Sequence, residues 1–408
     1  MVCFEVIILG GLGGPSEFST QCFMVRPLDS DNLKSICIDG GAGVGHIMDT
    51  LLISDEDRNV TIEDFNRAND DFNRYFNICH NKDSKDVNYN VNPDRLITKR
   101  VRYNTTSLSN VIDTTMLGFS NKVMGLLEDK PTVLQKAYRI YQGIISYFIT
   151  HPHLDHINGM ILNSPLLVDK EVESKKTIYG LDFTTNALKS CIFNDIIWPN
   201  LSDSKIGKLQ IETLNEYDSH QLREFPEWEI VPFRLCHGVK ITTEIRSYST
   251  VYLVRNKVKK NAIIFFGDMD YDQILVKNNN KVDLLNIFWN YLVEAVPLAN
   301  LSGIFIECSS SSKIKDKQLY GHLSPKHLIS ALRMLYDKYL SISNSKNSGD
   351  NKIQKFKLNV IITHVKMVAD SRDSRETILE ELKLLAKEHA ELQDITFYLA
   401  LNKYRFVL

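Results

Sequence analysis

The sequence predicts an α/β protein, and three observations lead to this fold class. Short apolar segments typical of buried strands occur in both halves of the chain, as at 262–266 and 358–363. Segments with the apolar spacing of an amphipathic helix alternate with them, for example 325–340. Glycine-rich turns such as Gly10–Pro15 separate the first strands. Because strands and helices that alternate along a chain pack in layers around one core, we expect a single domain over residues 1–408.

The individual elements follow from these patterns in chain order. Strands are expected at 4–9, 21–26, 35–39, 147–150, 177–181, 209–214, 229–236, 249–254, 262–266, 303–308, 358–363 and 395–401. Helices are expected at 132–146, 183–191, 325–340 and 375–392, and another is expected to begin near Gly159. Two segments depart from the pattern: the charged, asparagine-rich residues 55–130 predict an insertion, and the polar residues 341–354 predict a mobile loop.

The composition limits the partners and the compartment. The chain has 408 residues and a formal net charge of −2. A nucleic-acid-binding protein usually carries a basic patch and a high pI, so this charge argues against a polynucleotide partner. No apolar run is long enough to span a membrane, and the apolar N-terminal segment contains Glu5 and no basic residue, which argues against a signal peptide. The chain has seven cysteines, which is an odd number, and none of them forms a CxxC pair. This pattern indicates reduced thiols and therefore a cytoplasmic protein.

Three histidines and an aspartate lie within six residues, directly after an apolar strand. They are His151, His153, Asp155 and His156. Neutral imidazoles and a carboxylate are the ligands that zinc and related ions prefer. The first two can face one ion and the last two a second ion. Six residues cannot enclose two ions, so ligands from elsewhere in the chain are required.

Further ligand candidates occur in the same setting. His237, Asp268 and His364 each directly follow an apolar strand. Taken alone, a histidine after a strand is more often a surface residue, and a Gly-Asp pair is more often a turn. Loops at strand ends are also where a scaffold carries its chemistry, and all three residues share that setting with the histidine cluster. We therefore predict a metal site that combines them.

These motifs resemble the metallo-β-lactamase superfamily, in which an HxHxDH motif is followed by His, Asp and His in this order. Within it, the sequence resembles the fungal class II cyclic-nucleotide phosphodiesterases. The matching segments are Leu9–Pro15, Thr20–Gln21, Ile38–Gly41, Thr150–His156, Gly267–Asp268, Glu307–Ser309, Gly321–Ser324 and Thr363–Lys366. The resemblance implies an αββα sandwich with the site along the edge of two facing sheets.

The resemblance also implies a set of ligands for two divalent metal ions, with zinc as the expected element. One metal takes His151, His153 and His237, the other takes Asp155, His156 and His364, and Asp268 bridges them. Asp39 ends a strand before two glycines. The simpler interpretation is an aspartate that starts a turn. In the superfamily an aspartate at this position orients a ligand histidine, and we favour that role.

Glu307 and His322 are the expected acid pair. The simpler interpretation is that both are polar residues exposed to solvent. The alternative, which the phosphodiesterase branch shares, is that Glu307 holds a protonated His322, which gives its proton to the leaving oxygen. Ser309–Ser312 is expected to be a plain loop. Gly10–Gly14 is expected to be a tight turn, since neither a Walker lysine nor a helix follows it.

The expected activity is hydrolysis of 3′,5′-cyclic nucleotides, cyclic AMP and also cyclic GMP, to nucleoside 5′-monophosphates by a two-metal-activated hydroxide. The expected catalytic residues are His322, Glu307 and Asp155. The partner is then a small-molecule cyclic nucleotide, without nucleic acid or membrane, and a homodimer is compatible with the sequence. Three alternatives stay open: an RNA 3′-processing endonuclease of the same superfamily, a thioester or lactone hydrolase, and a non-catalytic scaffold. The near-neutral charge argues against the nuclease. The acid His322 argues against the thioester or lactone hydrolase, and the complete ligand set argues against the scaffold.

Overall fold

The computed structural model describes residues 2–56, 115–168, 175–202, 206–239, 243, 245–271, 283–346, 355–368 and 372–408. Most of the insertion predicted at 55–130 and of the loop predicted at 341–354 therefore lies outside the described residues. Among the described helices, none is long and apolar enough to cross a membrane.

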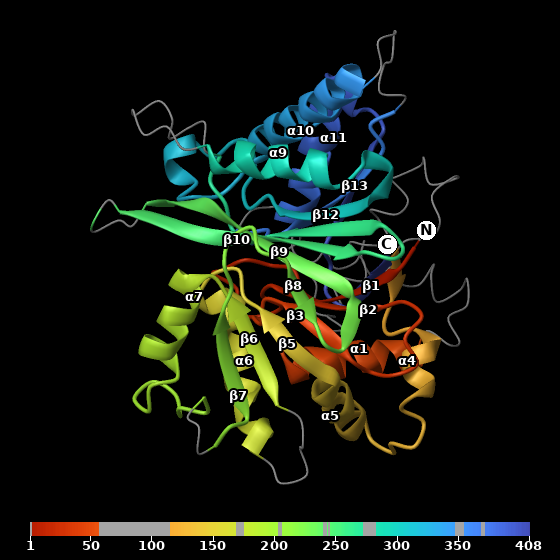
Figure 1. Ribbon diagram of the computed structural model, residues 1–408, viewed down its shortest axis with the longest axis vertical. Helices are drawn as coiled ribbons and strands as arrows, with labels where there is room; N and C mark the ends of the chain where they lie inside the picture. The colour runs from red at the N-terminus through yellow and green to blue at the C-terminus, as the bar shows by residue number, and fades with distance from the viewer. Residues whose placement is uncertain are drawn as a thin grey trace, which may run out of the picture.

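Two β-sheets pack face to face in the middle of the molecule (Figure 1). The strands of the first are β1 Phe4–Gly10, β2 Cys22–Pro27, β3 Ser35–Ile38, β4 Thr115–Leu117, β5 Ile144–Phe148, β6 Lys176–Gly180, β7 Leu209–Thr213 and β15 Tyr404–Val407. Their order in the sheet is β4-β15-β1-β2-β3-β5-β6-β7. The strands of the second are β8 His220–Leu222, β9 Phe225–Val239, β10 Arg246–Asn256, β11 Asn261–Phe266, β12 Leu301–Glu307, β13 Leu358–Thr363 and β14 Ile395–Leu399. Their order is β14-β13-β12-β11-β10-β9-β8.

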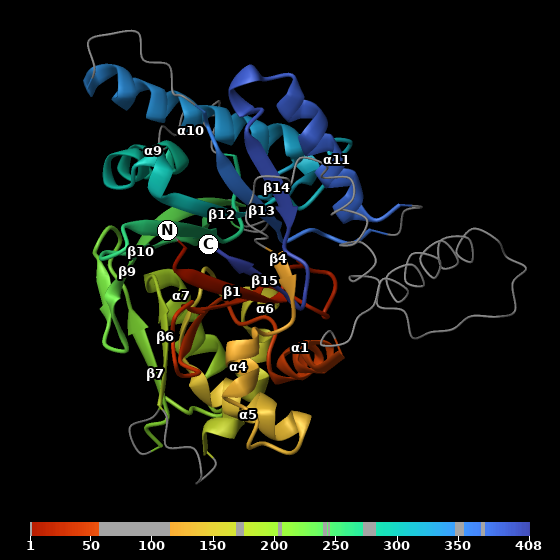
Figure 2. The ribbon, with the colours of Figure 1, turned by 90° about the vertical axis from the view of Figure 1, so that its right-hand side faces the viewer.

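Helices cover the outer faces of both sheets (Figures 1 and 2). Those on the first sheet are α1 Val44–Glu56, α4 Asn121–Gly125, α5 Val133–Gly143, α6 Leu154–Asn163 and α7 Asp182–Ala187. Those on the second sheet are α9 Leu284–Ala295, α10 Pro325–Lys346 and α11 Ser374–Lys387. Short helical turns are η3 Ser164–Val168, η4 Leu188–Ile192, η5 Leu298–Asn300, η6 Asp316–Gln318 and η7 Ala390–Leu392. Buried apolar clusters fill the space between each sheet and its helices and the space between the sheets. The fold is therefore the αββα sandwich that the sequence predicts.

Strand β11 shows why the apolar segments form buried strands. All of its residues are buried. Side chains alternate along a strand, so Ile264 and Phe266 join the cluster under the helices while Ile263 and Phe265 join the cluster between the sheets. There Phe265 stacks on Phe305 of β12, with 4.5 Å between the ring centroids. A strand covered on both faces has a continuous apolar sequence, which is the pattern that predicted it.

Some boundaries differ from the expected ones. The helix expected at 132–146 ends at Gly143, and Ile144 already pairs with Ser35 of β3. The β-branched isoleucines after Gly143 favour the strand over a further helical turn. The helix α10 continues beyond the expected residue 340 to Lys346 because no glycine or proline interrupts the segment before that point.

Residues 115–130, which the sequence assigns to the insertion, belong to the sandwich. Strand β4 pairs with β15 at the edge of the first sheet. In α4, Val123 and Met124 are buried in the cluster under that sheet. The insertion therefore ends before β4. Of its other residues, 55 and 56 end α1, and 57–114 lie outside the described part of the chain.

Candidate metal centre

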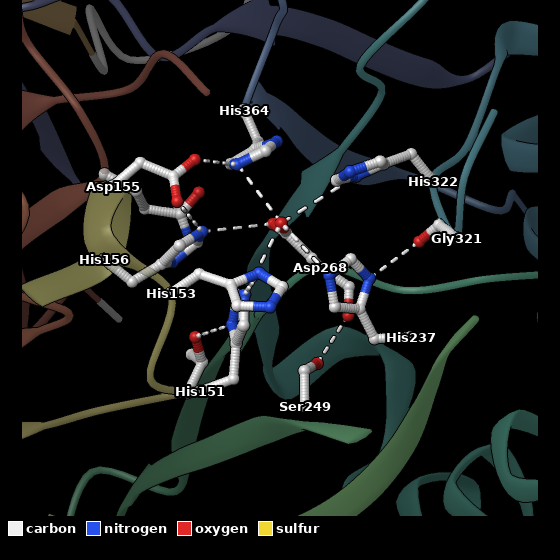
Figure 3. Close-up of polar contacts among 12 residues, drawn as sticks. His151, His153, Asp155, His156, His237, Ser249, Asp268, Gly321, His322 and His364 are labelled. Atoms are coloured by element: carbon white, nitrogen blue, oxygen red, sulfur yellow. Dashed lines mark hydrogen bonds and ion pairs between the residues drawn. The ribbon is translucent and has the colours of Figure 1, made fainter. Parts of the chain in front are cut away.

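Strand ends from both sheets carry the predicted ligands to one place. Strands β11, β12 and β13 are parallel neighbours, so their carboxyl ends meet at one edge of the second sheet. The ligands come from the end of β5 and the start of α6 (His151, His153, Asp155, His156), from β9 (His237), and from the segments after β11 (Asp268) and β13 (His364). Figure 3 shows these side chains turned toward one another around Asp268.

Three groups of side chains in the described residues could each hold a cation. They are His151, His153, His237 and Asp268; Asp155, His156 and His364; and Asp268, His322 and His364. Within each group the ligand atoms all lie within 4.8 Å of one another. The first two groups contain the residues that the sequence motifs assign to two metals.

The carboxylate of Asp268 lies between the first two groups. Its Oδ1 is 3.4 Å from Nε2 of His156, and its Oδ2 is 3.2 Å from Nε2 of His364. The same Oδ2 is 3.6 Å from Nε2 of His151 and 3.8 Å from Nε2 of His237. One buried carboxylate therefore faces histidines of both groups.

Each histidine that presents Nε2 to this centre uses Nδ1 elsewhere in the protein. The Nδ1 contacts are His151 to Thr150 Oγ1 at 3.1 Å, His156 to Asp39 Oδ2 at 2.8 Å, His237 to the carbonyl oxygen of Gly321 at 2.9 Å and His364 to Ser309 Oγ at 3.1 Å. Carboxylate and carbonyl oxygens only accept, so Nδ1 carries the hydrogen in His156 and His237. Their Nε2 atoms keep a lone pair directed at the centre, as in a metal-ligating histidine.

The centre contains buried polar atoms that other protein groups do not satisfy. Nε2 of His156 and Oδ1 of Asp268 are buried without a hydrogen-bond partner among the described residues. Nε2 of His151 and Nδ1 of His153 face each other at 3.0 Å. Buried polar atoms are normally paired. Nitrogen and carboxylate donors gathered in this way fit a divalent ion of the zinc class.

Burial and the carboxylates control the protonation of these histidines. Burial lowers the pKa of His151, and it lowers the pKa of His237 to about 4. Both rings are then neutral at pH 7 and can ligate a metal. Burial also lowers the pKa of His156, but the carboxylates of Asp268 and Asp39 outweigh it and raise the pKa well above its ordinary value. These carboxylates favour a positive charge close by. A proton on His156 supplies it in the absence of metal, and a cation bound beside Asp268 would supply it instead.

His322 differs from the other histidines of the centre. Its Nδ1 lies 3.1 Å and 3.2 Å from the two carboxylate oxygens of Glu307, and 3.8 Å from Oδ2 of Asp268. Because Nδ1 donates its hydrogen to Glu307, it has no lone pair to offer a metal. Burial lowers the pKa of His322, but Glu307 and Asp268 outweigh it and raise the pKa above its ordinary value. Glu307 and Asp268 therefore favour the protonated form of a histidine that lies beside the metal ligands.

The glycine turn after β1 packs against the predicted ligands. The N–H of Gly14 donates to Oδ2 of Asp155 at 2.8 Å. A Cβ on Gly13 would lie 2.4 Å from Cε1 of His364, so only glycine lets the turn approach that ring. The sequence predicts a tight turn here but not this contact, because the partners lie far apart along the chain.

The segment after β12 is a loop, as the sequence predicts, but it contains a buried residue whose contacts were not expected. Ser309, expected in a plain loop, is buried with its hydroxyl 2.6 Å from Oε2 of Glu307 and 3.1 Å from Nδ1 of His364. The only signal in the sequence is its place two residues after Glu307, at the end of a strand.

Comparison with known proteins shows similarity in both sequence and structure. Residues 94–402 match the family described as class-II cAMP phosphodiesterases. The 3′,5′-cyclic-nucleotide phosphodiesterase 1 of Saccharomyces cerevisiae is 36% identical over 408 residues, which cover 100% of both chains. A 3′,5′-cyclic-nucleotide phosphodiesterase of Candida albicans is 26% identical, with 94% of this chain and 95% of that protein covered. The crystal structure of unliganded yeast PDE1 superposes with a TM-score of 0.80 and 33% identity, and the alignment covers 100% of both chains.

Proposed function

Because the chain belongs to the class-II cAMP phosphodiesterase family, we propose that it hydrolyses 3′,5′-cyclic nucleotides to nucleoside 5′-monophosphates at the centre around Asp268. The observation that carries this proposal is the contact between Glu307 and His322 beside the ligand groups. A ribose 3′-alkoxide needs a proton to leave, and Glu307 favours the protonated form of His322 at the edge of the centre.

The proposed cofactors are two divalent metal ions, with zinc as the element. One would be held by His151, His153 and His237, the other by Asp155, His156 and His364, with Asp268 bridging. When bound, such ions supply a water nucleophile of lowered pKa and neutralise charge on the phosphate oxygens. The fit of the donors supports this assignment, since unsatisfied buried atoms of His156 and Asp268 face each other.

The chain's own residues would orient the reaction. Glu307 accepts from Nδ1 of His322, so the proton to be transferred lies on Nε2, at the opposite side of the ring. Asp39 and Thr150 form hydrogen bonds with His156 and His151 and so fix the rings of two proposed ligands.

We further propose that cyclic GMP is accepted beside cyclic AMP, because the assigned residues act on the cyclic phosphate, which both substrates share. We also propose a cytoplasmic location. None of the described cysteines forms a disulfide and all but Cys191 are buried, which suits a reducing compartment. Fractionation of cells that express the tagged protein tests this location. A homodimer stays a prediction, which light scattering tests.

The activity is tested by incubating the purified protein with cyclic AMP, cyclic GMP and a precursor tRNA. We expect turnover of both cyclic nucleotides, with the 5′-monophosphate as the product separated by chromatography, and no cleavage of the tRNA. Cleavage of the tRNA with intact cyclic nucleotides would instead support the RNA-processing alternative. Formation of a 3′-monophosphate would contradict the proposed role of His322, because the proton would then go to the other ester oxygen.

A further inference from the structure

The buried hydroxyl of Ser309 lies between the acid pair and a proposed metal ligand. Its Oγ is 2.6 Å from Oε2 of Glu307, 3.1 Å from Nδ1 of His364 and 3.4 Å from Nδ1 of His322. The carbonyl oxygen of His364 is 2.9 Å away. Ser309 is fully buried, so water does not compete for these contacts.

Counting hydrogens assigns the direction of these bonds. A serine hydroxyl has one hydrogen to donate and two lone pairs with which to accept. The carboxylate of Glu307 is the nearest acceptor and is charged, and hydrogen bonds to charged groups are the stronger ones, so the hydroxyl donates to Glu307. Oγ then accepts from His364, whose Nδ1 must carry the hydrogen. Nε2 of His364 faces Oδ2 of Asp155 at 3.1 Å and Oδ2 of Asp268 at 3.2 Å. These oxygens only accept, so Nε2 donates to them without a metal, and a cation among the three atoms would replace that hydrogen and leave Nε2 its lone pair.

The backbone holds this hydroxyl between two segments that are distant in sequence. The N–H of Ser309 donates to the carbonyl of Leu323 at 3.0 Å, and its carbonyl accepts from the N–H of Lys366 at 3.0 Å. One contact is next to His322 and the other is near His364. His364 itself has a φ of +55°, which is uncommon for a residue with a side chain, so its ring depends on surrounding contacts for its position.

We propose that Ser309 is a positioning residue with two effects. It fixes His364 in the tautomer that binds metal through Nε2, and it connects His364 to Glu307, which also accepts a hydrogen bond from His322. The proposal rests on the proposed function, since it treats His364 as a ligand and His322 as the acid. Loss of a partner that orients a metal-ligating histidine typically costs about 10–100-fold in metal affinity. We therefore expect the substitution Ser309→Ala to lower the affinity for the ion that is assigned to His364. The affinity for the other ion should stay nearly unchanged.

A matched control exists in the same part of the chain. Ser324 is also fully buried, and its Oγ lies 2.9 Å from Nδ1 of His327, outside the cation-binding groups. The substitution Ser324→Ala thus removes the same kind of serine–histidine contact without touching a proposed ligand. It should keep both metal affinities, whatever it does to the melting temperature.

The first measurement is competition for zinc by a chelator, without substrate, on the wild type, Ser309→Ala and Ser324→Ala. The expected result for Ser309→Ala is one ion bound about 10–100-fold more weakly. Unchanged affinity for both ions, or an equal loss in Ser324→Ala, would overturn the proposal. If Ser309→Ala does not fold, Ser309→Cys replaces it, because its thiol is a weak donor of similar size and should show the same loss.

A double-mutant cycle separates action through His364 from a general packing defect. If Ser309 acts through His364, the metal affinities of Ser309→Ala/His364→Ala should match those of His364→Ala alone. Losses that add would overturn the positioning role. Turnover of cyclic AMP by the wild type is measured separately. Absence of that turnover would remove the proposed function while the metal result stands, whereas normal turnover with unchanged metal binding in Ser309→Ala would remove only this inference.

Discussion

Nε2 of His156 and Oδ1 of Asp268 lie 3.4 Å apart in the interior, and neither has a hydrogen-bond partner among the described residues. An unsatisfied buried polar atom costs about 1–3 kcal/mol, so such a pair needs a compensating contact. A cation that both atoms ligate provides that contact. The stability of the protein should therefore depend on metal.

We expect about two zinc-class ions per chain, because the assigned ligands form two groups that share Asp268. Removing them with a chelator should lower the melting temperature and abolish turnover of cyclic nucleotides, and added zinc should restore both. Elemental analysis and thermal unfolding before and after chelation provide the measurements. Metal-free protein with full activity and an unchanged melting temperature would contradict the metal assignment.

Asp268→Ala should lose more activity than His364→Ala. The carboxylate of Asp268 faces histidines of both groups, whereas His364 is assigned to only one of the two proposed ions. Turnover and metal content are measured for both variants, with unfolding curves to show that each variant folds. Full metal content and near-normal turnover in Asp268→Ala would rule out the bridging role.

His322→Ala should keep its metals and its fold but lose turnover of cyclic AMP by a factor on the order of 10² to 10⁴, the usual cost of removing a general acid. The loss should be smaller for a p-nitrophenyl phosphodiester, because nitrophenolate leaves readily without a proton. An equal loss on both substrates would indicate a defect in binding or packing, and Glu307 would then lose its proposed role as well.

How much the sequence predicts depends on how many neighbours a segment has on each face. β13 is predicted to the residue, because a strand covered on both sides has a continuous apolar sequence. The helix α9 is not predicted, since apolar residues occupy most of its surface and hide the helical period. The strands β4 and β8 have three residues each, which is too short for an alternating pattern to appear.

The same distinction holds within the site. The proposed ligands can be predicted because they either cluster within His151–His156 or follow an apolar segment, and both are local features of the sequence. The roles of Ser309 and Gly13 cannot be predicted, because both depend on contact with His364, which lies far along the chain from Gly13 and on a different strand end from Ser309.

Gly13→Ala should therefore disturb the metal site although alanine is a small residue. Its Cβ would meet Cε1 of His364 at 2.4 Å, so the ring or the turn must move. We expect loss of one ion and of most turnover, measured by metal content and assay. Gly45→Ala is the control: it lies in the first turn of α1 with nothing within 4 Å of the added Cβ, and it should stabilise the fold by about 0.5–1 kcal/mol without loss of activity. Normal metal content in Gly13→Ala would contradict the packing argument.

A last prediction concerns Lys176, a buried lysine at the start of β6. Its Nζ donates to the carbonyl of Tyr141 at 2.6 Å and to the carbonyl of Ile144, and it lies 4.5 Å from the centre of the Tyr141 ring. Burial lowers the pKa of Lys176 to about 7. A neutral amine has two hydrogens, which is enough for both carbonyl acceptors, so loss of the third proton leaves these bonds intact.

The unfolded chain keeps a lysine pKa near 10.4. Between about pH 7 and 10 the unfolded state therefore binds more protons at Lys176 than the folded state, and stability rises with pH by at most about 1.4 kcal/mol per pH unit. Lys176→Met lacks this titration, so the free energy of unfolding of the wild type relative to that variant should increase between pH 7 and 9. Denaturant unfolding at several pH values measures the difference, in which other titrating groups cancel. A difference that does not change with pH would show that the carbonyls and the Tyr141 ring keep Lys176 charged in the folded state.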